Sequence, residues 1–144
     1  MGTYFAKVRR GTVRWHVVDA DGWALGRLAA RAALVLTGKA SPDFTPHVDG
    51  RNGLIVVNAE KVRLTGKKLD QKMYRHYTGY PGGLREINAR QLLATKPANL
   101  VREAILGMLP KSRLGDGLGR RLKVYAGPVH SHTAQKPSTL SLAR

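Results

Sequence analysis

Two aspartates follow a short apolar run and are the first residues whose spacing suggests a reaction. Residues 15–18 predict a buried strand, and Asp19 and Asp21 lie in the Asp-Ala-Asp-Gly turn that ends it. In aspartate-based phosphatases one carboxylate attacks phosphorus, and further acidic residues are needed to hold Mg²⁺. Beyond Glu86 no two acidic residues are neighbours in this sequence. We therefore interpret the two aspartates as a polar turn and keep phosphoryl transfer as the alternative.

His130 and His132 have a spacing that could ligate a metal ion. Protein zinc sites need three or four ligands, and no third ligand is evident in the sequence near this pair. The chain has no cysteine, which excludes disulfides, thiolate metal ligands and a cysteine nucleophile. We therefore expect neither a metal site nor a cofactor.

Residues 111–122 are rich in glycine and basic residues. Gly115, Gly117 and Gly119 do not form the G-x-G-x-x-G dinucleotide motif, and the sequence contains no G-x-x-x-x-G-K-[ST] phosphate loop. Four basic residues flank these glycines: Lys111, Arg113, Arg120 and Arg121. We predict a loop whose backbone lies close to a phosphate chain. A basic loop without a partner is the alternative.

Aromatic and basic residues alternate in the run 73–78, which is predicted to be a strand. Tyr74 and Tyr77 offer stacking planes, and Arg75 lies between them. Stacking combined with phosphate contacts is a common way to bind irregular or single-stranded RNA. The alternative is that alternate tyrosines face the core. Further candidates for this surface are Lys67, Lys68, Lys72 and Tyr80.

The charge balance favours a polyanionic partner. The 144 residues include 25 Lys plus Arg against 9 Asp plus Glu, a net charge of +16. Such a protein is best accommodated beside nucleic acid. Membrane surfaces would require apolar anchors or an amphipathic basic helix, and we find neither. The N-terminal segment lacks the apolar stretch of a secretory signal, so we expect a cytoplasmic protein without a membrane partner.

The candidate residues must be positioned by a single α/β domain. We expect an extended arm over 1–13, a core over 14–127 that includes the basic loop, and a tail over 128–144. Leu25 to Leu36 carries one apolar stripe and predicts a helix that stops at Gly38. The remaining elements are predicted as strands at 54–57, 62–65 and 123–126 and helices at 88–94 and 97–109. Because this order is not a clean doubly wound pattern, we expect a mixed sheet with helices packed against it.

Several segments in chain order match a known family. The matching segments are Val17 to Ala20, Leu25 to Ala29, Tyr77 to Gly83, Gly107 to Lys111 and Leu122 to Gly127, together with His130, His132, Ala134, Gln135 and Pro137. They closely resemble the bacterial large-subunit ribosomal protein thirteen family over about residues 14–137. The family commonly has His where this chain has Tyr80, which keeps a stacking ring but removes a possible cation.

This resemblance implies a three-layer α/β/α fold around a four-stranded sheet. It also implies a non-catalytic protein that binds 23S ribosomal RNA, lies beside other large-subunit proteins and helps the subunit assemble early. No cofactor or small-molecule substrate is implied. The predicted RNA-binding residues are Lys67, Lys68, Lys72, Tyr74, Arg75, Tyr80, Lys111, Arg113, Arg120, Arg121, Lys123, His130, His132 and Lys136.

A DNA-binding or regulatory protein is the remaining alternative, because composition alone does not separate ribosomal RNA from other nucleic acids. No helix-turn-helix or basic-region pattern supports it.

Overall fold

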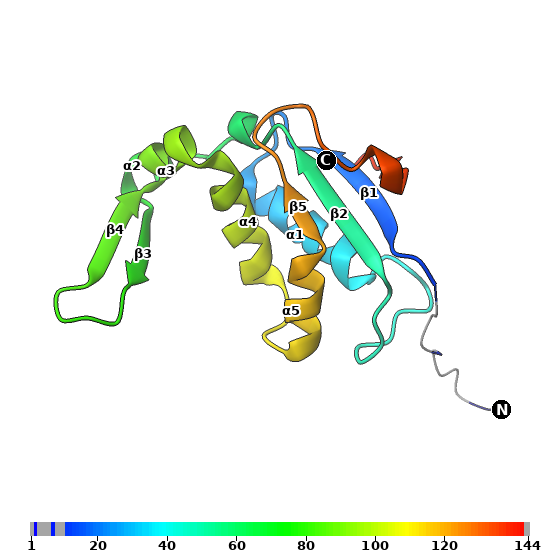
Figure 1. The fold of residues 1–144 in the computed structure, drawn as a ribbon. Coiled ribbons are helices and arrows are strands. Elements are labelled where there is room, and N and C mark those ends of the chain that lie inside the picture. Colours follow the sequence, from blue (N-terminus) through cyan, green and yellow to red (C-terminus); the bar gives the residue numbers. More distant parts are fainter. Residues whose placement is uncertain (1, 3–6, 8–10, 143–144) are drawn as a thin grey trace.

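The computed structural model describes residues 2, 7 and 11–142, and it confirms the α/β class (Figure 1). Residues 1, 3–6 and 8–10 of the expected arm, and residues 143–144 of the expected tail, lie outside the described residues. Among the described residues, no helix has both the length and the apolar character needed to cross a bilayer.

Four parallel strands form the central sheet, in the order β5-β2-β1-β6. These strands are β1 (Arg14–Asp19), β2 (Asn52–Val57), β5 (Leu122–Val124) and β6 (Ser138–Thr139). In the register, Val18 lies opposite Val56, and Val56 lies opposite Val124. The apolar run of β2 is buried on both faces, as parallel sheets require. The parallel strands and the antiparallel strands occur in two separate sheets.

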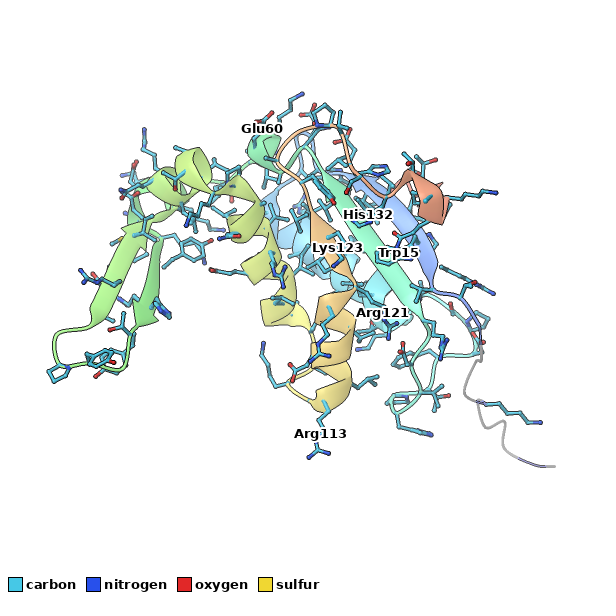
Figure 2. The ribbon with its side chains drawn as sticks, in the orientation of Figure 1. Trp15, Glu60, Arg113, Arg121, Lys123 and His132 are labelled. Atoms are coloured by element: carbon cyan, nitrogen blue, oxygen red, sulfur yellow. The ribbon has the colours of Figure 1, made fainter. Side chains whose placement is uncertain are left out.

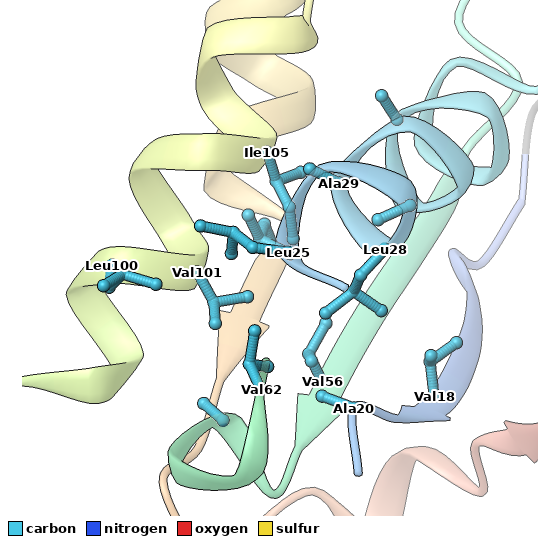
Figure 3. Close-up of a cluster of buried hydrophobic side chains, with 14 of the residues drawn as sticks. Val18, Ala20, Leu25, Leu28, Ala29, Val56, Val62, Leu100, Val101 and Ile105 are labelled. Atoms are coloured by element: carbon cyan, nitrogen blue, oxygen red, sulfur yellow. The ribbon is translucent and has the colours of Figure 1, made fainter. Parts of the chain in front are cut away.

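Two long helices, α1 (Leu25–Thr37) and α4 (Pro97–Met108), cover one face of this sheet (Figures 1 and 3). Leu28, Val101 and Ile105 are fully buried in the shared core. Helix α1 ends where predicted, because Gly38 adopts the left-handed conformation with φ 78° and its N–H bonds back to the last turn. The other face of the sheet carries Trp15 and meets the C-terminal segment.

The predicted helix starts at Asn88 and Pro97 are confirmed. Helix α3 (Ala89–Thr95) begins after Asn88, whose side-chain oxygen accepts a hydrogen bond from the N–H of Gln91 at 2.8 Å. Pro97 occupies the first turn of α4, where its missing N–H costs nothing.

A two-stranded hairpin projects away from the central sheet (Figure 1). It consists of β3 (Met73–Tyr77), which was predicted, and β4 (Leu84–Asn88), which was not, in antiparallel register. The short helix α2 (Lys68–Gln71) precedes it, and the 3-10 turn η1 (Ala59–Lys61) follows β2. Strand β4 was missed because most of its side chains are exposed and its apolar residues, Leu84 and Ile87, do not alternate with polar ones.

The predicted strand at 62–65 is wrong. Only Arg63 pairs, as an isolated parallel bridge to Ala24. The N–H of Arg63 donates to the carbonyl of Trp23 at 2.8 Å, and its own carbonyl accepts from the N–H of Leu25 at 3.0 Å. Val62 and Leu64 bury their side chains in the core, and this burial accounts for the alternation in the sequence.

The predicted basic loop at 111–122 is also wrong, because residues 113–120 form helix α5 (Arg113–Arg120). Ser112 caps the helix by accepting a hydrogen bond from the N–H of Gly115 at 3.3 Å. A Cβ at Gly115 would lie 1.8 Å from the Pro110 carbonyl oxygen. Glycine in a helix costs about 1 kcal/mol relative to alanine, but here the missing side chain permits close packing that a sequence pattern does not reveal.

The C-terminal segment is more ordered than a tail. It contains the 3-10 turn η2 (Thr133–Gln135) and strand β6, which pairs with β1 at the sheet edge. His16 and Ser138 share a side-chain hydrogen bond of 2.9 Å, and the N–H of Leu140 donates to the carbonyl of Val17 at 2.8 Å. A strand of two residues is too short to carry a sequence signal.

Candidate nucleic-acid interface

Basic side chains greatly outnumber the carboxylates that could neutralise them. If each of the 9 carboxylates paired with one of the 25 Lys and Arg residues, the net charge of +16 would still remain unpaired. The ion pairs include Asp21 with Lys61 at 3.7 Å and Asp70 with Arg90 at 2.8 Å, all with exposed side chains. The surface therefore presents many cations without an internal partner.

The first group of predicted residues lies on α2 and the hairpin. Lys67, Lys68 and Lys72 are exposed, and the ammonium of Lys72 lies 5.2 Å from the ring centre of Tyr74. Tyr80, at the turn of the hairpin, is 75 % exposed. Its ring is therefore free to stack on a base.

Two predicted residues in the hairpin have internal roles. The guanidinium of Arg75 pairs with Glu86 on the opposite strand. Tyr74 is partly buried, and this burial, assisted by the charge of Glu103, raises the pKa of its hydroxyl. Tyr74 thus behaves as a partly buried strand residue, the alternative that the sequence had left open.

The second group lies on and around α5. Arg113 and Arg120 are exposed and have no carboxylate partner among the described residues. The ammonium of Lys111 donates to the carbonyl of Leu106 at 3.1 Å and so caps the end of α4. Arg113 and Arg120 are therefore the members most available to an external phosphate.

Arg121 is held by an internal carboxylate. Its guanidinium donates two hydrogen bonds to Asp49, and its side chain is only 20 % exposed. These hydrogen bonds hold the pKa of Asp49 below its usual value, against the opposing effect of burial. The pair joins the end of α5 to the loop before β2, so Arg121 has a structural role.

The third group lies on the sheet face opposite the helices. His132 stacks on Trp15 with ring centres 5.8 Å apart and planes 7° from parallel, and it shares a 2.8 Å hydrogen bond with the hydroxyl of Tyr125. The ring nitrogen of His130 accepts from the N–H of His132 at 3.2 Å. These contacts hold the C-terminal segment on the sheet. Lys123 is partly buried, whereas Lys136 is exposed.

The predicted residues form separate groups and do not converge on one pocket. Figure 2 shows Arg113, Arg121 and Lys123 following one another along α5 and β5, whereas the hairpin lies at the far end of the molecule, beyond α4. Such an arrangement suits phosphate contacts spread over a folded polynucleotide. It does not suit the assembly of a small reactive centre.

Several exposed arginines were absent from the predicted set, and three of them lie on or beside helix α1. Arg27 and Arg31 lie on α1 and Arg63 lies beside its first turn, and none has a carboxylate partner among the described residues. The four-residue spacing of Arg27 and Arg31 was visible in the sequence. The position of Arg63 beside them depends on its bridge to Ala24, which sequence spacing does not show.

The aspartates that suggested phosphoryl transfer form a polar turn. One carboxylate oxygen of Asp19 accepts hydrogen bonds from the side chain of Asn58 at 2.8 Å and from the N–H of Asp21 at 3.0 Å. These bonds, the first above all, lower the pKa of Asp19. Within the described part of the chain, no group of three His, Asp or Glu side chains could hold a metal ion.

The family model and the similar proteins all point to one family. A family described as ribosomal protein L13 matches residues 13–131. The chain is 56 % identical to a protein of Alkaliphilus oremlandii and 53 % identical to one of Alkaliphilus metalliredigens, each over 142 residues that cover 99 % of this chain and at least 99 % of the relative. It is 51 % identical to a Clostridioides difficile protein over 98 % of this chain and 99 % of that protein. All three relatives are named large ribosomal subunit protein uL13.

Proposed function

Because the chain belongs to the ribosomal protein L13 family, a family of structural ribosomal proteins and not of enzymes, we propose that it binds 23S ribosomal RNA and supports early assembly of the large subunit. It is a structural constituent of that subunit, located in the ribosome in the cytoplasm. The phosphatase interpretation of Asp19 and Asp21 is therefore abandoned.

The observation that carries RNA binding is the set of exposed cations without an internal carboxylate. Arg113 and Arg120 on α5, and Lys67 and Lys68 beside the hairpin, are solvent-exposed. Such cations contact phosphates alike whatever the base, so they fix the position of the protein on the RNA. Specificity for 23S RNA then comes from the three-dimensional shape of the folded polynucleotide.

A role in assembly follows from the separation of the cationic groups. The hairpin and α5 lie on opposite sides of α4 (Figure 2), so one protein can contact RNA segments that are distant from each other. Neutralising phosphates at both places lowers their mutual repulsion and favours their approach.

Tyr77 and Leu84 are exposed on the hairpin, and this end of the molecule is our candidate contact with neighbouring large-subunit proteins.

The test is a double variant of the two available arginines, Arg113→Gln with Arg120→Gln. The affinity for 23S RNA is measured over a range of salt concentrations. We expect weaker binding and a log–log salt slope that is shallower by about 0.7–0.9 for each lost phosphate contact.

The matched control is Lys61→Gln with Arg90→Gln, which removes the same charge from two exposed residues that already pair with carboxylates. The control should change the slope less. Equal slopes for the wild type and the α5 variant would contradict the assignment of α5 to the interface.

A further inference from the structure

A groove of about 880 Å³ lies beside the first turn of α1. Its walls come from that turn, from residues 63–65, from the α2–β3 segment and from α4. Leu25, Leu64, Ala104 and Met108 supply apolar surface. This volume lies within the range of about 300–1,000 Å³ that is typical of sites for small organic groups.

The groove is strongly cationic. Arg27, Arg63, Lys68 and Lys72 line it, and Glu103 is the single acidic residue among its lining side chains. None of the four cations forms an ion pair within the described residues. Four cations from three separate segments therefore surround an apolar wall, which favours an anionic occupant that also has an apolar part.

The first turn of α1 contributes backbone donors to the same groove. No side chain caps the helix, and its first turn has no acidic residue. The N–H of Leu25 donates to the carbonyl of Arg63 at 3.0 Å, whereas the N–H groups of Gly26 and Arg27 have no acceptor among the described residues. A Cβ at Gly26 would meet no atom within 4 Å, so this end of the helix is open to an anion.

The wall of the groove also contains an unsatisfied polar group. The hydroxyl oxygen of Tyr74 is buried, and no described residue forms a hydrogen bond with it. A buried polar group without a partner costs free energy.

We propose that the groove holds one unstacked nucleotide of the bound RNA, an inference that rests on the proposed function. The phosphate lies at the first turn of α1 beside Arg27 and Arg63, and the base packs on the apolar wall near Tyr74. Glu103 is placed to accept a hydrogen bond from an exocyclic amino group of the base. An acidic peptide would bring its carboxylates close to Glu103, and for this reason a nucleotide is favoured.

The sharpest test compares Gly26→Asp with Gly26→Asn. A negative charge in the first turn of a helix favours the helix, so the Asp variant should fold at least as well as the wild type, which a thermal melt checks. The same charge lies where the phosphate is expected. We predict that Gly26→Asp weakens binding to 23S RNA at least about tenfold, since like charges in contact strongly oppose association, and that Gly26→Asn, which adds the same bulk without the charge, weakens it clearly less. Equal affinities of the two variants would overturn the proposal.

A nucleotide probe makes the inference independent of 23S RNA binding. Adenosine 5′-monophosphate at millimolar concentration should shift the amide signals of Gly26 and Arg27 in the wild-type chain, but not in Gly26→Asp. Absence of these shifts in the wild type would overturn the groove proposal. If the shifts appear but the wild type shows no preference for 23S RNA, the proposed function is refuted, whereas the assignment of the groove as a nucleotide site is supported.

Crosslinking in the assembled large subunit distinguishes RNA from protein. Met108 lines the groove and Leu34 does not, and both are partly exposed. With either residue replaced by a photoreactive benzoylphenylalanine, a crosslink from position 108 to RNA, above the background at position 34, would support the proposal. A crosslink from position 108 to a neighbouring protein would contradict it.

Discussion

Two glycines in helix α5 should respond in opposite directions to the same substitution, because their surroundings differ. A Cβ at Gly115 would lie 1.8 Å from the carbonyl oxygen of Pro110, far inside van der Waals contact, whereas a Cβ at Gly117 would meet no atom within 4 Å. Both residues lie within Arg113–Arg120. Each alanine therefore gains the same helix propensity, and the clash is present in only one of them.

The expected magnitudes follow from this difference. Alanine is favoured over glycine in a helix by about 1 kcal/mol, so Gly117→Ala should raise the free energy of unfolding by about that amount. At Gly115 the same gain is opposed by overpacking against rigid backbone, which typically costs about 1–3 kcal/mol and occasionally more. Because the obstructing atom is a main-chain oxygen, we expect Gly115→Ala to lower the free energy of unfolding by about 1 kcal/mol or more.

Urea unfolding followed by circular dichroism measures both variants. A higher midpoint for Gly117→Ala and a lower midpoint for Gly115→Ala, with unchanged slopes, would confirm a helix packed closely on the end of α4. If residues 113–120 were a loop, neither substitution would follow this pattern. Equal midpoints for the two variants would refute the packing described here.

Two further predictions concern stability. Asp49→Asn should lower the free energy of unfolding by about 2 kcal/mol at pH 7, because Arg121 loses a charge-assisted pair. The folded-state pKa of Asp49 is lowered, so the contribution of the pair is complete above the unfolded value of about 3.9 and is lost as the pH falls through the folded value. The difference between wild type and variant should therefore shrink in acid, and a difference that stays constant down to pH 2 would contradict it. Asn88→Ala removes the cap on the N–H of Gln91 and should cost about 1 kcal/mol in chemical denaturation, whereas no loss would show that α3 does not depend on this cap.

The sequence predicted the helices and strands whose formation depends on residues near one another in the chain. The apolar stripe of α1 with Gly38 after it, the continuous apolar run of β2, the cap at Asn88 and the helix start at Pro97 each depend on residues close in the chain. Strand β6 depends on pairing with β1 at the other end of the chain, and helix α5 depends on close packing against the end of α4. The glycines of α5 argue against a helix until the carbonyl of Pro110 and the side chain of Leu106 are known to lie against them.

For the candidate interface as well, the sequence identified residues by their type but not the partners that folding brings to them. Residue type alone identified the cations, and the structure leaves Arg113 and Arg120 exposed as a nucleic-acid partner requires. Sequence reasoning did not separate them from Arg121, whose partner Asp49 is 72 positions away in the chain. The groove beside α1 was missed for a related reason, since Arg27, Arg63 and Lys68 converge only after folding.

The central claim is that this chain binds the RNA of the large ribosomal subunit. The most direct measurement is sucrose-gradient sedimentation of a cell extract, followed by a high-salt wash of the separated subunits and detection of the chain in each fraction. We predict that the chain remains with the large subunit after the wash. Its recovery at the top of the gradient, or with duplex DNA in place of the subunit, would contradict the account.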